Sequence, residues 1–208
     1  MHAATTSTLA HPAAAQAAAP KHSLWGTAVR FTLVTTLLLG IGYPLLITAA
    51  AQFLFPRQAD GSLIQKNGQI IGSELLAQGF ASDRYFHPRP SAAGNGYDAT
   101  SSGGSNLAQS SSKLVQRMQG DIDKLARENP GTPVPIDLVT TSGSGLDPDI
   151  TPDAAYFQAP RIAKARGLSE AQVRQLIAQH ITGRQFGILG EPRVNVLLLN
   201  LDLDSQTK

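Results

Sequence analysis

The residues FTLVTTLLLGIGYPLLITAAAQFLFP, from Phe31 to Pro56, form a stretch of 26 residues without a charged side chain. As a helix that rises about 1.5 Å per residue, the stretch would be roughly 39 Å long, which exceeds the ~30 Å hydrocarbon core of a bilayer. A core helix in a soluble domain normally has a polar face. The sequence therefore predicts a single membrane-spanning anchor, which we assign to residues 24–56.

A cleaved signal peptide is the alternative interpretation of the same stretch. The alanines from Ala49 to Ala51 provide the small residues that a signal peptidase accepts, and Lys21 and Arg30 provide a basic N-terminal region. However, the apolar stretch is longer than the ~7–15 residues of a signal-peptide core, and it begins only at residue 31. Its length favours a retained anchor.

The flanks of the stretch give a weak preference for one orientation. The cytoplasmic flank of a membrane span usually carries more basic residues than the opposite flank. Here the two flanks carry nearly equal numbers, so this rule gives only a weak preference for a cytoplasmic N-terminus. Residues 1–23 are rich in Ala and are predicted to be a disordered cytoplasmic leader. Residues 57–208 are numerous enough to bury roughly 70% of their unfolded surface. We therefore expect a cytoplasmic N-terminus and one extracytoplasmic (periplasmic) domain over residues 57–208.

The first half of this domain contains a hairpin signal and a long irregular segment. Asn67-Gly68, a tight-turn dipeptide, separates two short apolar segments and predicts a β-hairpin. The Pro- and Gly-rich segment from Tyr85 to Asn106 predicts a loop of the length that is usually functional. A helix is expected over Leu107–Glu128, capped by Ser105 or Asn106.

The second half predicts two more helices and a final strand, so the fold class is α+β: a single N-terminal transmembrane helix followed by one compact domain of mixed helices and strands. An irregular segment over residues 140–152 is followed by a short helix capped by Thr151, which Pro160 interrupts with a kink. A helical continuation to about Arg166 ends at Gly167. The next helix has a capping box of Ser169 and Gln172 and ends at Gly183, and a strand is expected over Val194–Leu203.

Composition excludes several classes of function for the domain. Residues 58–208 carry 14 basic and 15 acidic side chains, whereas nucleic-acid binding needs a clustered basic surface. The absence of cysteine excludes disulfide and thiolate chemistry. The sequence contains neither a P-loop nor the ligand spacing of a zinc or calcium site. Of the two histidines in the domain, His180 is expected at the end of a helix and His87 in the irregular segment.

One short motif matches an enzyme class. Ser110 and Lys113 have the S-x-x-K spacing of serine acyl-enzymes, in which the amine takes the proton of the hydroxyl. The other motifs of that class are missing, so a polar helix start is the simpler interpretation, and an outward-facing acyl-enzyme is the alternative function.

Two Gly/Ser-rich loops are candidate contact sites. The first is Ser102-Gly103-Gly104-Ser105-Asn106, and the second, within residues 142–148, includes Ser144, Gly145 and Asp147. Backbone amides exposed before a helix can hold an anion. Glycine and asparagine also serve tight turns, and a structural role is the interpretation that we favour for both loops.

Several motifs, taken in order, resemble the C subunit of the Kdp-type potassium-transporting ATPase of bacteria (the KdpC family). The resemblance extends over residues 24–204 and is specific because many motifs share one order. They are GYPL at 42–45, IGS at 71–73, YFHPRPSA at 85–92, SGGSNL at 102–107, SGSGLDP at 142–148 and VNVLLLNL at 194–201.

The resemblance implies a non-catalytic, single-span accessory subunit of an inner-membrane complex. Its partners would be a channel-like potassium-binding subunit, a P-type ATPase subunit and a small single-span subunit. Members of the family are described as catalytic chaperones that raise the ATP affinity of the hydrolysing subunit and aid assembly. No cofactor is expected to bind tightly, and association with ATP is implied by the resemblance only. Candidate contact residues are Arg89, Ser102, Gly103, Gly104, Ser105, Asn106, Ser144, Gly145 and Asp147.

Because both loops follow the anchor, a bilayer would separate them from cytoplasmic ATP. We therefore expect any effect on ATP to pass through assembly or through the conformational state of the complex. The irregular segment Tyr85–Asn106 is expected to contact the outer mouth of the channel-like subunit.

Overall fold

A computed structural model describes residues Ser23–Gln206, so the predicted leader lies outside the described residues except for Ser23. The chain divides into two compact units, and the boundary in the sequence falls between Leu54 and Phe55.

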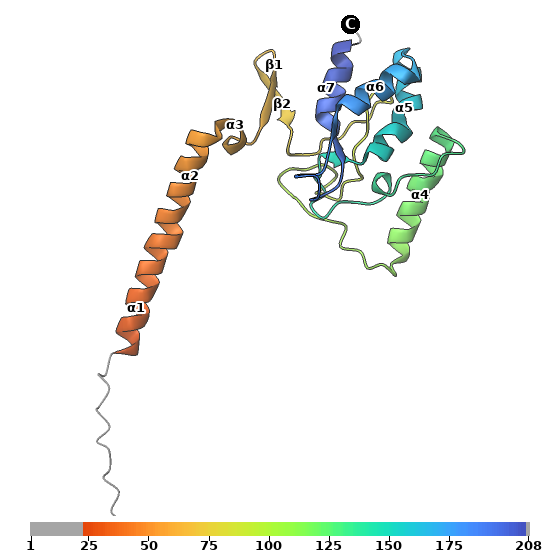
Figure 1. Cartoon of the computed structure of the whole chain (residues 1–208). Helices are drawn as coiled ribbons and strands as arrows, with labels where there is room; N and C mark the ends of the chain where they lie inside the picture. Colours follow the sequence, from red (N-terminus) through yellow and green to blue (C-terminus); the bar gives the residue numbers. More distant parts are fainter. Residues whose placement is uncertain (1–22, 207–208) are drawn as a thin grey trace, which may run out of the picture. The chain divides into compact units, whose positions relative to one another are not determined.

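The first unit is a helix over Leu24–Leu54, long and apolar enough to cross a membrane. It consists of α1 (Leu24–Thr35), a π-helical segment η1 (Thr36–Gly42) and α2 (Tyr43–Leu54) (Figure 1). None of these residues is buried within the structure. The Oγ of Ser23 accepts a hydrogen bond from the N–H of Gly26 and so caps the first turn. The structure thus contains the predicted candidate span.

The π-helical segment ends immediately before Tyr43-Pro44. Pro44 lacks an N–H, and in a regular α-helix its ring would collide with the carbonyl of Gly40, four residues earlier. A π-bulge alters the spacing of the carbonyls in a helix. The proline therefore gives a local reason for the wider turns that precede it.

The second unit begins with a short helix and the predicted hairpin. Helix α3 (Pro56–Ala59) leads into β1 (Leu63–Lys66), which pairs antiparallel with β2 (Gln69–Ser73). Asn67 and Gly68 form the turn with φ angles of 54° and 77°, the left-handed conformation that such a tight turn requires. The predicted hairpin is confirmed.

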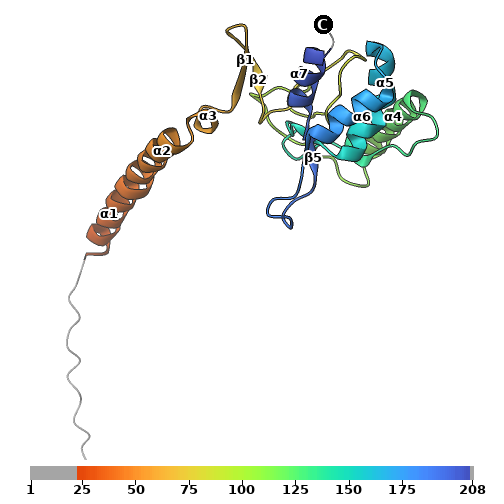
Figure 2. The ribbon, with the colours of Figure 1, turned by 45° about the horizontal axis from the view of Figure 1, so that its top comes forward.

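A small sheet and three helices enclose the core of this unit. The sheet has the order β3-β5-β4, all antiparallel, with β3 (Asp149–Ile150), β4 (Ile181–Thr182) and β5 (Arg193–Asn195). Figures 1 and 2 show α5 (Pro152–Arg166), α6 (Glu170–Gln179) and α7 (Val196–Gln206) gathered around it. The largest fully buried apolar side chains are Phe86, Ile162, Leu176, Ile177, Leu199 and Leu203.

Helix α4 (Ser112–Glu128) and the 3₁₀ turn η2 (Ile136–Leu138) complete the unit. The predicted start of the first helix at Leu107 is wrong, although its end at Glu128 is correct. Asn106 has a φ of 52°, which is incompatible with a helical residue, and Ser111 occupies the N-cap position instead. The segment from Glu74 to Ser111 contains neither helix nor strand, as expected for Tyr85–Asn106.

Helix α5 begins at the predicted cap, where the Oγ1 of Thr151 accepts from the N–H of Ala154 at 3.1 Å. It ends at the predicted Gly167, which adopts a φ of 68°. Pro160 lies within one uninterrupted helix, so the predicted interruption of the helix at Pro160 is wrong.

Helix α6 has the predicted capping box of Ser169 and Gln172, but it ends at Gln179 rather than Gly183. The residues after His180 instead form β4, which pairs with β5. The prediction of a strand over Val194–Leu203 is largely wrong. Only Arg193–Asn195 is strand, and Val196–Gln206 is helix. A continuous apolar run does not distinguish a buried helix from a buried strand, and here the helix buries both apolar side chains and Asn200.

Candidate functional site

The two Gly/Ser loops, far apart in the sequence, lie against each other. The N–H of Gly103 donates to the carbonyl of Ser144 at 2.8 Å, and the Oγ of Ser102 donates to the same carbonyl at 3.0 Å. Gly104 packs so closely that a Cβ atom there would lie 3.2 Å from the carbonyl oxygen of Gly143. We call the contact between residues 102–104 and residues 142–147 the loop junction.

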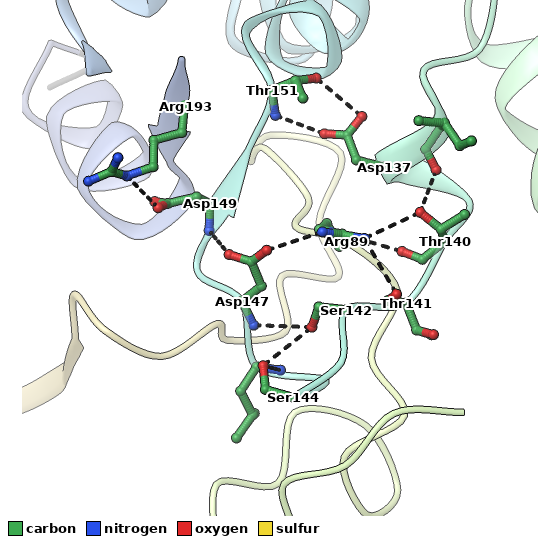
Figure 3. Close-up of polar contacts among 12 residues, drawn as sticks. Arg89, Asp137, Thr140, Thr141, Ser142, Ser144, Asp147, Asp149, Thr151 and Arg193 are labelled. Carbon is green, nitrogen blue, oxygen red and sulfur yellow. Dashed lines mark hydrogen bonds and ion pairs between the residues drawn. The ribbon is translucent and has the colours of Figure 1, made fainter. Parts of the chain in front are cut away.

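Arg89, in the irregular segment, bonds to a residue of the second Gly/Ser loop and to the threonines just before that loop (Figure 3). Its Nη1 donates to the Oδ2 of Asp147 at 3.2 Å. Its Nε and Nη2 donate to the carbonyls of Thr140 and Thr141, each at 3.4 Å. The ion pair is partly exposed, with side-chain exposures of 25% and 34%, so its net contribution to stability is small. The main effect of the Arg89 side chain is to hold its own segment against Thr140, Thr141 and Asp147.

The serines of the second loop satisfy backbone groups of their own loop. Ser144 Oγ accepts from the N–H of Leu146 at 3.1 Å, and Ser142 Oγ accepts from the N–H of Asp147 at 3.4 Å. The N–H of Gly145 donates to the carbonyl of Ser142. These amides are therefore engaged within the loop. A phosphate cradle, by contrast, needs amides that point outward.

The carboxylates of Asp137, Asp147 and Asp149 lie near Arg89, and the three residues line a hollow together with it (Figure 3). Asp147 Oδ1 accepts from the N–H of Asp149, whose own carboxylate pairs with Arg193 at 2.9 Å. Burial raises the pKa of Asp149, and the charge of Asp147 adds to that increase, whereas Arg193 lowers it. Asp137 accepts from the N–H of Thr151 at 2.8 Å and so supports the start of α5.

Two hollows adjoin the loop junction. One, of about 600 Å³, is lined by Leu75, Leu76 and the Gly/Ser loops. The other, of about 270 Å³, lies between Arg89 and the acidic side chains next to β5. Leu75 is 55% exposed, so the first hollow combines an apolar side with a polar one.

Of the predicted contact residues, Arg89, Ser102, Gly103, Gly104, Ser144, Gly145 and Asp147 come together at the loop junction. Ser105 and Asn106 do not join it, because no hydrogen bond from either residue is found within the described part of the chain. Helix α4 starts at Ser112, so the first loop does not precede a helix N-terminus directly. The specific premise for an anion site there is therefore wrong.

Sequence reasoning missed Ser91 and Tyr97, which support the loop junction. Ser91 Oγ donates to the carbonyl of Gly145 at 2.6 Å and accepts from the N–H of Tyr97 at 2.8 Å. Tyr97 Oη donates to the carbonyl of Arg89 at 2.9 Å, and burial raises the pKa of its phenol. Their position in the irregular segment gave no signal that distinguished them from neighbouring loop residues.

Two buried amide side chains hold the backbone of Phe86 and His87, just before Arg89, in place. The sequence prediction missed these amides as well. Asn200 accepts from the N–H of Phe86 at 2.8 Å and donates to its carbonyl at 3.0 Å. Gln158 makes the same pair of bonds with His87, at 2.8 and 3.1 Å. The sequence did contain a signal for them, since Gln158 and Asn200 are polar residues among the apolar residues of α5 and α7.

The geometry of Ser110 and Lys113 differs from the acyl-enzyme arrangement. Ser110 precedes α4, both side chains are exposed, and no hydrogen bond joins them in the described residues. His180 occupies the C-cap of α6, as expected for the end of a helix, and its Nε2 lies 3.0 Å from Asp202. Among residues 23–206, no cluster of three or more potential metal ligands is present.

Comparison with known proteins gives a consistent result. The family profile described as "KdpC: K+-transporting ATPase, c chain" matches residues 25–205. A relative from Acidobacterium capsulatum is 63% identical over 179 residues, which cover 86% of this chain and 96% of the relative. Relatives from Koribacter versatilis and Bradyrhizobium diazoefficiens are 57% and 53% identical, with 86% and 85% of this chain and 92% and 94% of the relatives covered. All three are described as "Potassium-transporting ATPase KdpC subunit".

Proposed function

Because the chain belongs to the KdpC family of K+-transporting ATPase subunits, we propose that it is a non-catalytic accessory subunit of a potassium-uptake complex. In this role it raises the ATP affinity of the hydrolysing subunit and stabilises the assembly. Its partners are a channel-like potassium-binding subunit, a P-type ATPase subunit and a small single-span subunit.

The family match carries the proposal of a complex subunit, and the internal engagement of the loop junction supports the non-catalytic part of it. The guanidinium of Arg89 bonds to Asp147, Thr140 and Thr141. Four backbone amides also bond within the junction, those of Gly103, Gly145, Leu146 and Asp147. Polar groups that hold one another do not present a nucleophile or a phosphate cradle. Such a cluster is suited to holding a surface in a fixed shape for a partner.

We place the N-terminus in the cytoplasm and the domain in the periplasm, with one span in the inner membrane. The candidate span over Leu24–Leu54 is the supporting feature. In this orientation the domain acts on ATP indirectly, through preferential binding to one conformational state of the complex. A partner that binds one state more tightly shifts the equilibrium toward that state.

Labelling of introduced cysteines tests the orientation, since the chain has none of its own. Gln116→Cys lies on the exposed side of α4, and Ala13→Cys lies in the predicted leader. A membrane-impermeant maleimide should label Gln116→Cys in intact cells with a permeabilised outer membrane and Ala13→Cys only after lysis. The reverse pattern would contradict the proposed orientation.

Kinetics of the purified complex test the accessory role. Complexes isolated through a tag on the ATP-hydrolysing subunit, with and without this chain, should differ several-fold in KM for ATP. The yield of intact complex should also fall without the chain, while kcat of the surviving complex changes little. Equal KM values and equal yields would refute the accessory role.

A further inference from the structure

The segment between β4 and β5 presents three apolar side chains to solvent. Phe186 is 84% exposed, Ile188 75% and Leu189 54%. We call these three residues the apolar tip. Figure 2 shows the segment that leads into β5 extending away from the body of its unit. Single exposed apolar residues are normal on protein surfaces, but three within four positions form a patch.

Hydrogen bonds and an ion pair hold the tip in a defined shape. The N–H of Gln185 donates to the carbonyl of Leu189 at 2.8 Å, and the N–H of Leu189 donates back to Gln185 at 2.9 Å. Arg184 and Glu191 pair across the base of the segment at 2.6 Å. A surface whose shape is fixed before binding loses less conformational entropy when a partner docks.

The backbone at Phe186 indicates that its ring is exposed at a cost. Phe186 has a φ of 53°, in the left-handed region that bulky residues rarely occupy. Phe186 gains little burial within the chain, since most of its surface is exposed. A large apolar side chain that is both strained and exposed does not serve the stability of the fold, which leaves binding as its use.

We propose that the apolar tip docks into an apolar pocket on another subunit of the same membrane complex, an inference that rests on the proposed function. Phe186 is the central anchor and Ile188 and Leu189 surround it. The arrangement matches interface hot spots, in which a large apolar side chain fills a pocket and neighbouring groups exclude water.

Size favours a partner that is already held nearby. Three such side chains bury on the order of 400 Å², whereas a free-standing interface buries about 800 Å² on each partner. The tip alone is therefore too small to hold a second copy of this chain in solution. A membrane anchor keeps the chain at high effective concentration beside its partners, so that a small contact is sufficient.

Charge argues against a lipid surface as the occupant. Loops and helices that insert into the interface usually combine aromatic residues with unpaired Lys or Arg. No basic residue lies between Gln185 and Gly190, and the guanidinium of Arg184 is paired with Glu191. The side chain of Glu191 is 73% exposed and would be repelled by anionic headgroups.

Site-specific photo-cross-linking in the intact complex tests the contact. Benzoylphenylalanine at position 186 should give a ultraviolet-induced adduct with another subunit of the complex, identified by mass spectrometry. The same group at position 115 is the control, since Val115 is 57% exposed on α4. Adducts only with lipid, only with a second copy, or no stronger than those from position 115 would overturn the inference.

A substitution gives an independent measurement. Phe186→Gly removes the ring but suits the left-handed backbone, so the segment should retain its shape and the chain its thermal stability. The half-life of this chain in the solubilised complex should fall about ten-fold, while Val115→Ala leaves it unchanged. An unchanged half-life for Phe186→Gly would refute the docking role.

The two proposals fail separately. If Phe186→Gly leaves both the half-life and the KM for ATP as they were, the docking inference is wrong and the accessory function stands. If a cross-link forms from position 186 but removal of the whole chain leaves the KM for ATP unchanged, the tip docks and the effect on ATP is wrong.

Discussion

A Cβ atom on Gly145 would lie 2.5 Å from the carbonyl oxygen of Gly103 and 2.7 Å from the amide nitrogen of Ala93. Gly145 also has a φ of 67°. Three segments of the chain therefore meet at a point where the backbone conformation and the available space both require glycine. This contact sets the spacing of the loop junction.

Gly145→Ala should destabilise the protein by about 2–4 kcal/mol, because it adds left-handed backbone strain to a steric clash with backbone atoms. The midpoint of urea unfolding of the full chain in detergent measures the effect. Gly143→Ala is the matched control, since a Cβ atom there meets no neighbour within 4 Å. Equal midpoints for the two variants would show that the two loops can move apart at Gly145 without loss of stability, which would contradict this prediction.

Asn200→Leu should cost about 2–4 kcal/mol, because it leaves the buried N–H and C=O of Phe86 without their amide partner. The same unfolding measurement applies, and hydrogen exchange at Phe86 should speed up. Asn95→Ala, at an exposed loop position, should unfold like the parent. If Asn200→Leu were neutral, the amide would not be what orders the segment before the loop junction.

Local signals in the sequence predicted the elements that local chemistry determines. Asn67-Gly68 predicted the hairpin and Thr151-Pro152 predicted the start of α5, because turns and caps depend on a few adjacent residues. The helix Val196–Gln206 was predicted as a strand, because an apolar run fits both structures until its packing partners are known. Ile181 was likewise predicted as part of the preceding helix, but it lies in β4 because it pairs with Val194 of β5.

The candidate site was predicted in part for a similar reason. Both Gly/Ser loops could be recognised by composition, but their mutual contact depends on chain segments about 40 residues apart, as between Ser102 and Ser144. Ser91 and Tyr97 act through hydrogen bonds to backbone atoms, and such bonds leave no pattern in a single sequence. Long-range packing thus decided what composition left open.

Ser110→Ala should leave potassium-limited growth unchanged. The hydroxyl is exposed and precedes α4, so its removal disturbs neither a core nor a helical hydrogen bond. Growth of a strain that depends on this uptake complex, at low external potassium, is the readout, with Lys113→Met as a second variant. Loss of growth in both variants at normal complex levels would revive the acyl-enzyme alternative.

Stability should fall as the pH drops through about 6.5, in a manner that depends on His87. Burial lowers the pKa of this imidazole, and the charge of Arg161 lowers it further. Because the folded pKa lies below the unfolded value of about 6.5, the unfolded chain binds the proton first, and acidification through that value favours unfolding. His87→Gln should reduce the slope of unfolding free energy against pH, whereas Asn95→Ala should retain it. Identical slopes in the parent and His87→Gln would exclude this histidine as the cause.

Arg161 connects α5 to α4 and to the irregular segment through a side chain that is only 9% exposed. Its guanidinium pairs with Glu128 and donates to the carbonyl of Tyr85 and to Gln158. Arg161→Met should therefore cost about 3–5 kcal/mol, since it leaves a largely buried carboxylate without its partner.

The matched control for that change is Arg174→Met, which breaks an exposed pair with Glu170 on a single helix. It should cost at most about 1 kcal/mol, because solvent screens the pair and the stacking on Tyr156 is a weak contact. Double substitution Arg161→Met with Glu128→Leu should recover part of the loss, since the unpaired charge is then removed. If the double variant were as unstable as the single one, the carbonyl contacts of Arg161, and not the ion pair, would be what holds α4 against the core.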